Sequence, residues 1–289
     1  MGLFSGLEKF GLGKLENMDV FEEETKQQSQ NGKDGAVSAP KVEEQDLLFD
    51  KSFTCPVCDK EFHSKMVRTG KVKLLSADTD LRPKYQLVDS LKYDALVCPH
   101  CGYAALSRFF KFMLPAQAKM IRENISSNFK GIDTTSSTYS YDEAIMRHQL
   151  ALANAVVKKA KTSEKAYTCL KMAWLYRGKA EHLSKDSKDY SSELRELKKQ
   201  ELELLKNACE GFKAAYSKES FPMCGMDEIT MTYLIADLCR RVGLFDESSR
   251  WISRVLTSRG ANERIKNKAR DLKELLEKDK ERIAKAKHA

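Results

Sequence analysis

The sequence has no run of about 20 consecutive apolar residues, which is the length that a membrane-spanning helix requires. Its first residues also lack a basic segment followed by an apolar core, so we expect no secretory signal. The chain contains no Gly-rich phosphate loop, no HExxH metalloprotease motif and no GxSxG nucleophile turn. These absences favour a cytoplasmic protein without a transmembrane segment, and they give no support to an enzyme.

The composition is sufficient to build folded cores. Of the 289 residues, 42% are hydrophobic and 32% are charged, as expected of a soluble protein. At about 150 residues per domain, this length predicts two folded units with additional tails. Without an export signal the eight cysteines would stay in a reducing compartment, where paired cysteines act as metal ligands rather than as disulfides.

Two short stretches of the form Cys-x-x-Cys stand out, Cys55–Cys58 and Cys98–Cys101. Two thiols three residues apart on a tight turn can point at one ion while backbone N–H groups bond to the sulfurs. The residue after the second Cys of such a turn must accept a left-handed backbone conformation. Gly102 does so freely, and Asp59 belongs to the few other residue types that tolerate it.

We therefore predict one metal site per chain, with the ligands Cys55, Cys58, Cys98 and Cys101. Four thiolates suit a tetrahedral zinc ion, and iron can take the same ligands. They would fill the coordination shell and leave no position for water, so the site should be structural rather than hydrolytic. His63 and His100 lie beside the two turns, but we expect them to be surface or neighbouring residues rather than ligands.

The other four cysteines are expected to play no part in the metal site. Cys169, Cys209 and Cys239 fall on apolar helical stripes and are predicted to be core residues. Cys224 lies in the loop 221–225 and is the best candidate for an exposed thiol with a redox role.

Residues 51–130 are predicted to form a small zinc-ribbon-like domain. Alternating apolar residues around Thr69-Gly70, and again over 93–97, indicate strands. The 39 residues between the two Cys-x-x-Cys turns are many for a simple ribbon. The polar segment Asp78–Tyr85 is expected to fill part of this length as an ordered loop.

After the second turn the pattern changes period. The aromatic-rich segment Tyr103–Phe112 is predicted to be helical, and Pro115 is expected in the first turn of a helix that ends near Ile125. Residues 126–140 are rich in Ser and Thr and read as a domain boundary.

Residues 131–289 are predicted to be helical throughout. Ser140 and Glu143 form a capping-box pattern at the start of the first of these helices. The predicted helices cover roughly 140–160, 163–183, 190–217, 227–242, 246–258 and 262–286.

A degenerate repeat runs through these helices. In tetratricopeptide (TPR) repeats, small, bulky and small residues at spacings of four and three let paired helices approach. Ala208, Phe212 and Ala215 have this spacing. Ser248, followed at the same spacings by an Ile and a Val, repeats it more loosely. This pattern predicts a TPR-like stack with one face free for binding.

Residues 1–50 are predicted to be an apolar leader followed by an acidic flexible linker. Four apolar residues fall near one helical face, while four glycines weaken any free helix; the apolar residues are Leu3, Phe4, Leu7 and Phe10. We expect this leader to dock on the protein's own helices, with a partner, a membrane surface or disorder as the alternatives.

The charge distribution gives weak support to a polyanion partner. Residues 1–50 carry 5 Lys against 11 acidic residues, whereas residues 51–130 carry 14 basic against 7 acidic residues. The last forty residues are basic too, but their charges alternate at helical spacing, which is typical of a solvated face.

The leader, the two cysteine turns with their flanking CPVCDKEFHSKMVR and VCPHCGYAA, the RPKY segment and the helical tail together resemble a known family. It is an uncharacterised bacterial family, common in Gram-positive anaerobes and catalogued as a domain of unknown function. The resemblance implies a cytosolic zinc-binding protein with TPR-like helices, and it supplies no activity.

We thus predict an α+β, mostly α protein with a small zinc-ribbon-like domain followed by a TPR-like α-helical repeat domain. Its predicted function is that of a non-enzymatic zinc-binding module that binds a protein or peptide through its helices. A nucleic-acid-binding regulator that uses the basic ribbon, and a thiol or zinc redox sensor, are the alternatives.

Overall fold

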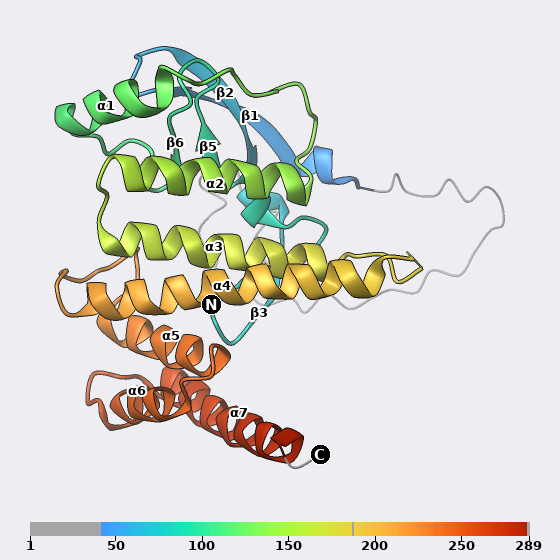
Figure 1. Ribbon diagram of the computed structural model, residues 1–289, viewed down its shortest axis with the longest axis vertical. Coiled ribbons are helices and arrows are strands. Elements are labelled where there is room, and N and C mark those ends of the chain that lie inside the picture. Colours follow the sequence, from blue (N-terminus) through green and yellow to red (C-terminus); the bar gives the residue numbers. More distant parts are fainter. Residues whose placement is uncertain (1–41, 187, 288–289) are drawn as a thin grey trace, which may run out of the picture. The chain divides into compact units, whose positions relative to one another are not determined.

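The computed structural model describes residues 42–186 and 188–287, and Figure 1 shows the order of their elements. The structure is 56% helical, with seven α-helices and small antiparallel sheets in the described part, which confirms the predicted mostly α, α+β class. Within this part, no helix has the length and apolar character needed to cross a membrane. The predicted leader lies outside the described residues.

The strands form three separate two-stranded antiparallel ribbons, β1–β2, β3–β4 and β5–β6. Their bounds are β1 Leu48–Thr54, β2 Glu61–Val67, β3 Leu74–Ala77, β4 Pro83–Tyr85, β5 Ala95–Val97 and β6 Ala104–Leu106. The first and third ribbons each carry one cysteine turn, as expected of a zinc-ribbon arrangement. The second belongs to the long segment between the turns.

The predicted helix over Tyr103–Phe112 is wrong. Residues 104–106 instead form β6, which pairs with β5, and turns follow up to the start of α1. Ala104, Ala105 and Leu106 are buried together, so their packing between β5 and the helices overrides the helical preference of Ala and Leu. Pro115 does begin a helix, as predicted.

From α2 onward the helices begin and end within three residues of the predicted positions, whereas α1 ends four residues before the predicted Ile125. Their bounds are α1 Pro115–Ile121, α2 Tyr141–Val157, α3 Thr162–Glu181, α4 Tyr190–Tyr216, α5 Glu228–Arg241, α6 Phe245–Thr257 and α7 Glu263–Lys287, with a π-helical turn, Arg122–Ser126, directly after α1. At the start of α2, the Ser140 hydroxyl accepts a hydrogen bond from the Glu143 N–H at 3.1 Å. The Glu143 carboxylate accepts from Arg147 instead of returning to the cap.

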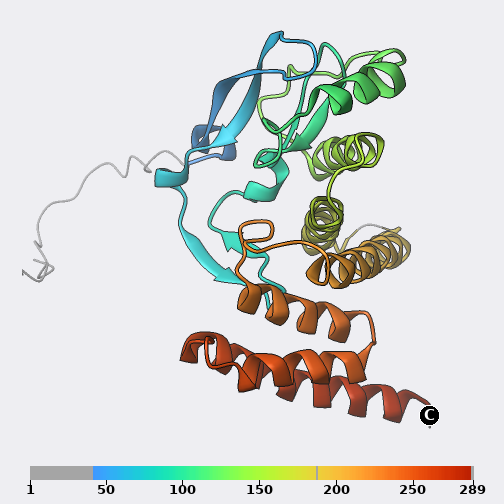
Figure 2. The same cartoon turned by 90° about the vertical axis from the view of Figure 1, so that its left-hand side faces the viewer.

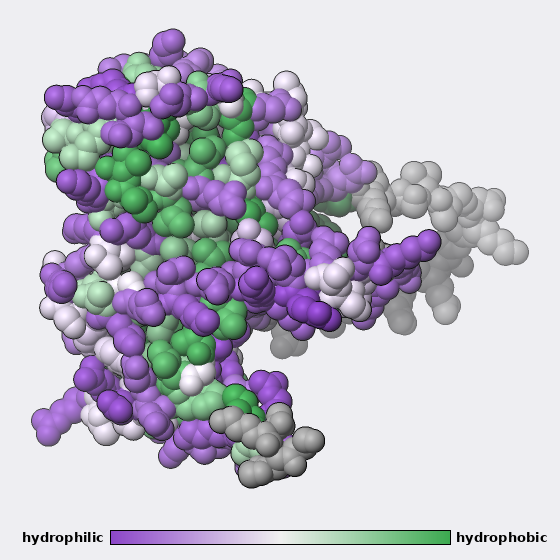
Figure 3. All heavy atoms as spheres, in the orientation of Figure 1, coloured by the Kyte–Doolittle hydropathy of each residue, from purple (hydrophilic) through white to green (hydrophobic). Residues whose placement is uncertain are grey.

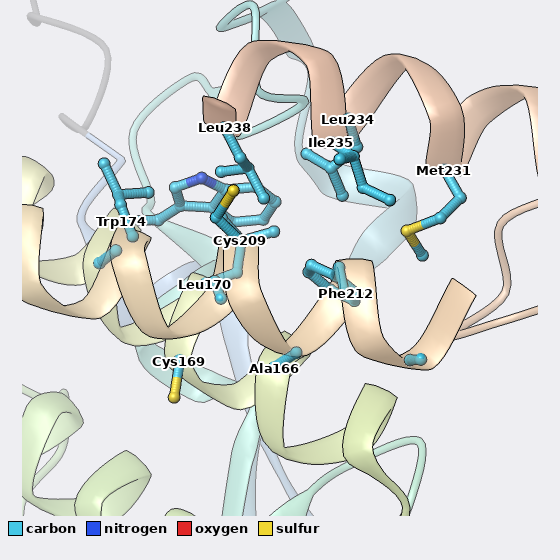
Figure 4. Packing of buried hydrophobic residues seen from close by; sticks show 14 of the residues in the cluster. Ala166, Cys169, Leu170, Trp174, Cys209, Phe212, Met231, Leu234, Ile235 and Leu238 are labelled. Carbon is cyan, nitrogen blue, oxygen red and sulfur yellow. The ribbon is translucent and has the colours of Figure 1, made fainter. Parts of the chain in front are cut away.

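The residues of the predicted repeat lie where helices approach each other. Ala208, Phe212 and Ala215 on α4 are fully buried, and in Figure 4 Phe212 points toward α5. On α6, the buried Ser248 donates a hydrogen bond to the Ala236 carbonyl of α5 at 2.8 Å. The spacing therefore identified close helix contacts, while the assignment to the TPR class stays a prediction.

The segment between the cysteine turns runs along the helices and inserts its tip between them. In Figure 2 it passes from β2 down to α5. At the tip of the β3–β4 hairpin, Asp80 accepts hydrogen bonds from Trp174 Nε1 at 3.0 Å and from Arg177 Nη2 at 2.6 Å. The neighbouring Thr79 hydroxyl donates to the buried Asp237 of α5 at 2.7 Å. The insertion between the turns thus fastens the cysteine-bearing part of the chain to α3 and α5.

The third ribbon packs directly on α2. Ala95, Val97, Ala104 and Leu106 form one buried cluster with Ala151 of α2. The unit that begins at Val42 is compact as a whole, and the proposed boundary near residue 130 stays a prediction.

Close to this contact, α2 carries a buried histidine. His148 has no exposed surface, and its Nδ1 lies 2.7 Å from the Ala144 carbonyl oxygen. Its Nε2 has no hydrogen-bond partner among the described residues. Burial lowers the pKa of His148 to about 4, and the charge of Lys171 acts in the same direction against the opposing effect of Asp94.

We expect His148 to make stability depend on pH. Because its pKa is lower in the folded chain than the usual value near 6.5, the neutral ring contributes fully above about pH 6.5. The contribution declines as pH falls toward 4 and amounts to about 3 kcal/mol in total. Urea unfolding of the wild type and of His148→Gln between pH 7.5 and 4.5 measures this effect. The free energy of unfolding should fall more steeply with decreasing pH for the wild type than for the variant. Parallel curves would show that the histidine does not titrate on unfolding.

Candidate metal centre

The first cysteine turn joins β1 to β2. The Cys55 N–H donates to the Lys60 carbonyl at 3.0 Å, and the Asp59 N–H donates back to the Cys55 carbonyl at 2.9 Å. Asp59 has a φ of 58°, which is the left-handed conformation that the sequence predicted for it. These bonds hold the two thiols of the turn on one side of the backbone.

The second turn, between β5 and β6, repeats the same pattern. The Cys98 N–H donates to the Tyr103 carbonyl at 2.8 Å, and the Gly102 N–H donates to the Cys98 carbonyl at 3.0 Å. Gly102 has a φ of 73°. A β-carbon at this position would lie 2.6 Å from the ring of Phe129, so the glycine is required by packing as well as by conformation.

The two turns bring all four sulfurs together. The Sγ atoms of Cys55, Cys58, Cys98 and Cys101 lie within 4.8 Å of one another. The Cys55–Cys101 and Cys58–Cys98 sulfur distances are 3.6 and 3.7 Å. Thiolates about 2.3 Å from a common ion at tetrahedral corners would lie about 3.8 Å apart. The four cysteines can therefore hold one metal ion.

The backbone and the neighbouring thiols determine the electrostatics of this site. Hydrogen bonds with Cys101 and Cys55 lower the pKa of Cys98, and the N–H groups of His100 and Cys101 add to this effect. Hydrogen bonds with Cys101 and Cys98, together with burial, raise the pKa of Cys55. When no cation is bound, Cys55 thus keeps its proton while negative charge collects on Cys98, and a cation that displaces the remaining proton would be held by buried thiolates.

Aromatic side chains shield the cluster from solvent. The rings of Phe53, Phe62 and Phe110 pack against one another at centroid distances of 5.7 to 6.2 Å. The buried Tyr103 hydroxyl donates to the Phe110 carbonyl at 3.0 Å. Cys55 and Cys98 have no exposed surface beneath this cover.

Two further contacts, which the sequence did not reveal, tie the turns to the helices. Arg122, in the π-helical turn, donates to the Val57 carbonyl at 2.9 Å. The buried Asn154 of α2 donates to the Gly102 carbonyl at 3.1 Å. Both acceptors are backbone carbonyls, for which no sequence motif exists.

The remaining candidates fall outside the cluster. His63 and His100 are exposed, and His100 Nε2 lies 3.2 Å from the Glu61 carbonyl oxygen rather than near a sulfur. Cys169, Cys209 and Cys239 are buried, as predicted. Cys224 is half-buried, and burial raises the pKa of its thiol to about 12. This thiol stays protonated at neutral pH, which disfavours a redox role.

Fold and site together define two cysteine-bearing ribbons, whose four thiols could hold one metal ion, joined to a set of packed helices. Residues 48–276 match the model of a family described as an uncharacterised protein conserved in bacteria (DUF2225), and the chain belongs to this family. Comparisons with curated proteins and with solved structures gave no match.

Proposed function

We propose that this protein is a non-enzymatic cytoplasmic interaction module, in which a structural zinc ion folds the ribbon and the helical domain binds a protein segment. A four-thiolate site supports the structural role, because it leaves no coordination position for a substrate. The observation that carries the binding role is a cavity of about 530 Å³ between α4, α5 and α7. In Figure 3 the surface is hollowed beside the overhanging part of α4.

Zinc is the ion that best suits the site. The 3.6 and 3.7 Å sulfur distances match the edges of a zinc–thiolate tetrahedron, and an unexported chain would meet zinc in the cytosol. Iron in the same ligand set is the alternative.

One zinc ion per chain is the expected result of metal analysis on the purified protein. The Cys98→Ser variant should lose it, because three thiolates no longer close the shell. The matched control is Cys169→Ser, which removes a buried thiol from α3 and should keep the metal. Stoichiometric zinc in a variant that lacks both Cys98 and Cys101 would contradict this assignment. Visible iron–thiolate absorption of the purified protein would show that the ion is iron rather than zinc.

The helical cavity is lined by both apolar and charged side chains. Leu202 and Leu205 of α4, Phe245 of α6 and Ile283 of α7 line it, and Leu202 and Ile283 are each 39% exposed. The charged residues that line it are Lys198, Glu201, Arg240, Arg241, Asp279 and Arg282. Arg240 and Arg241 are paired with the buried Asp237, which leaves Lys198 and the 78% exposed Arg282 to attract a ligand. The cavity therefore suits an amphipathic segment with apolar residues on one side and acidic residues on the other.

Peptide selection against the full-length zinc-loaded protein tests this binding role. Display libraries of amphipathic helices should return acidic sequences, and Leu202→Asp or Ile283→Asp should weaken their binding at least tenfold. Leu114→Asp is the control, because Leu114 is a 65% exposed leucine at the start of α1 that does not line this cavity. Selected peptides that bind all three variants equally would rule out this cavity.

A second candidate function rests on the surface of β1. A cavity of about 360 Å³ there is lined by Lys51, Phe53 and Lys111 among others, and no carboxylate lines it. The nearby Phe112 is 75% exposed. Aromatic rings beside lysines suit single-stranded nucleic acid, whose bases stack while its phosphates pair with the cations. Binding of oligothymidylate that weakens steeply with salt and is lost in Lys51→Glu/Lys111→Glu would favour this function.

A further inference from the structure

The β1–β2 ribbon leaves one edge of β2 without a partner strand. β2 pairs with β1 from Glu61 to Val67, and no third strand joins this sheet in the described part of the chain. A free strand edge presents backbone N–H and C=O groups that can pair with another chain. Which residues present them follows from the phase of the β1–β2 hydrogen bonds.

Two bonds that bracket the ribbon fix this phase. The Cys55 N–H donates to the Lys60 carbonyl at 3.0 Å, and at the other end the Arg68 N–H donates to the Leu47 carbonyl at 2.8 Å. In an antiparallel pair, every second residue exchanges hydrogen bonds with its partner. Every second residue of β2, counted from Lys60 or from Arg68, therefore bonds to β1, and Phe62 and Ser64 are among these residues.

The residues between them, Glu61, His63 and Lys65, therefore direct their backbone groups away from β1. The Glu61 carbonyl confirms this direction, because His100 Nε2 reaches it from outside the ribbon at 3.2 Å. No backbone hydrogen bond to His63 or Lys65 from outside the ribbon occurs within the described ranges.

A cavity of about 480 Å³ runs along this edge. Five consecutive residues of β2, Glu61 to Lys65, line one side, which spans about 13 Å at the usual rise per strand residue. Thr134, Thr135 and Tyr139, from the segment before α2, line it as well and are called the wall below. Asp50 of β1, Pro99 and His100 complete the lining. Ser64 also lines the cavity. It is 3% exposed, and its hydroxyl has no hydrogen-bond partner in the described structure.

The wall is held in place by its own contacts. The Tyr139 ring stacks on the Tyr93 ring, with 5.1 Å between the ring centroids. The guanidinium group of Arg147, on α2, lies 3.9 Å from the Tyr139 centroid. The Asp133 carboxylate accepts hydrogen bonds from the N–H and the hydroxyl of Thr135, both at 2.8 Å. These contacts order the residues of the wall, and the cavity between the wall and β2 is called the trench below.

We infer that this trench binds an extended peptide segment of another protein, which adds to β2 as a third strand. The outward N–H and C=O groups of His63 and Lys65 supply the main-chain bonds, and the Ser64 hydroxyl supplies a further polar contact. A second copy of the chain suits the trench less well, because its β2 would bring β1 with it against the wall. This site is separate from the helical cavity between α4, α5 and α7.

The charges along the edge define the chemistry of the segment. Antiparallel addition is the more stable arrangement, and cross-strand pairs of opposite charge stabilise it. An acidic residue then lies opposite Lys65, where it competes with Asp50 of β1 for the ammonium group, and a basic residue four positions later lies opposite Glu61. A blocked peptide with this pattern, Ac-Thr-Glu-Val-Thr-Val-Lys-Thr-NH2, is the probe.

Amide exchange of the full zinc-loaded chain with this peptide gives the main test. The His63 and Lys65 amides should gain protection, whereas the Phe62 and Ser64 amides, already bonded to β1, should not change. Lack of added protection at His63 and Lys65 at millimolar peptide would overturn the inference. Protection that grows with protein concentration in the absence of peptide would also overturn it, because a second copy would then be the occupant.

A matched pair of proline variants tests the edge itself. Ser52 and His63 lie opposite each other, and their N–H groups face opposite edges of the ribbon. His63→Pro should weaken peptide binding at least tenfold, while Ser52→Pro should change it less than twofold. If either proline variant loses zinc, N-methylated versions of the peptide are tested on the wild type instead. Methylation of the backbone nitrogens of the peptide's Glu and central Thr should abolish binding, whereas methylation of those of its two Val should not. Equal losses of binding for the two methylated peptides would overturn the inference.

Discussion

Removal of the metal ion is expected to unfold residues 51–125 while most of the helical domain stays folded. Binding of structural zinc contributes about 10 kcal/mol, which is comparable to the about 5–15 kcal/mol that stabilises a whole domain. The aromatic side chains that cover the site are carried by small two-stranded ribbons. These ribbons are not expected to stay folded once the metal ion no longer joins the two cysteine turns. Helix α2 should respond too, because Asn154 donates to Gly102 and Ala151 packs on β5 and β6.

Hydrogen exchange before and after chelation measures this. The amides of β1, β2, β5 and β6 should lose protection, α2 should lose part of it, and α5 and α6 should keep theirs. Apart from Leu81 in the β3–β4 hairpin, the buried cluster of α5 and α6 contains no residue of 51–125, so these two helices serve as the internal reference. Unchanged protection over residues 51–125 after complete metal removal would mean that the ion does not hold this part of the fold.

The sequence predicted the clustering of the four cysteines because its signal is local. Each turn needs two thiols three residues apart and a residue that accepts a left-handed φ, and Asp59 and Gly102 have φ values of 58° and 73°. The helices from Ser140 onward could also be predicted from the sequence, because apolar periodicity and an N-cap hydroxyl are properties of neighbouring residues.

Features that depend on residues far apart in the chain could not be predicted in this way. The segment Tyr103–Phe112 has a helical composition, yet Ala104 to Leu106 pair with β5 and form a strand. Asp78–Tyr85 was expected to be an ordered loop, but nothing in its sequence indicates that Asp80 meets Trp174 and Arg177. Such contacts arise only once the helices have packed, and no periodicity encodes them.

Asp80 stands at the centre of the largest buried ionic network of the described residues. Its carboxylate is fully buried and lies within 3.0 Å of both Arg177 Nη atoms and within 3.5 Å of Arg241 Nε. Burial acts to raise its pKa, but the hydrogen bonds and charge of Arg177, with the charge of Arg241, outweigh burial and lower it. The carboxylate is therefore ionised at neutral pH and bridges the guanidinium groups of Arg177 on α3 and Arg241 on α5.

Replacement of Asp80 by Asn is expected to cost about 1.5–3 kcal/mol, because it removes buried charge-assisted hydrogen bonds while Arg177 keeps Asp78 and Glu201 as partners. The β3–β4 hairpin should then detach from the helices, so its amides should exchange faster than those of α3. Asp50→Asn is the matched control. Asp50 pairs with Lys65 at 3.0 Å, but it is 58% exposed, and an exposed pair contributes about 0–1 kcal/mol.

The pH dependence of the Asp80→Asn effect distinguishes a charge from a simple packing contact. Because the folded state lowers the pKa of Asp80, its stabilisation is complete above the unfolded value of about 3.9 and is lost as pH falls through the lower, folded value. Urea unfolding of the wild type and of Asp80→Asn should thus differ by a constant free energy from pH 7 to 5. The difference should shrink as the pH drops below about 4. A gap that stays the same at pH 3 would mean that Asp80 acts through shape alone, and a gap below about 1 kcal/mol at pH 7 would show that the hairpin does not fasten the ribbon to the helices.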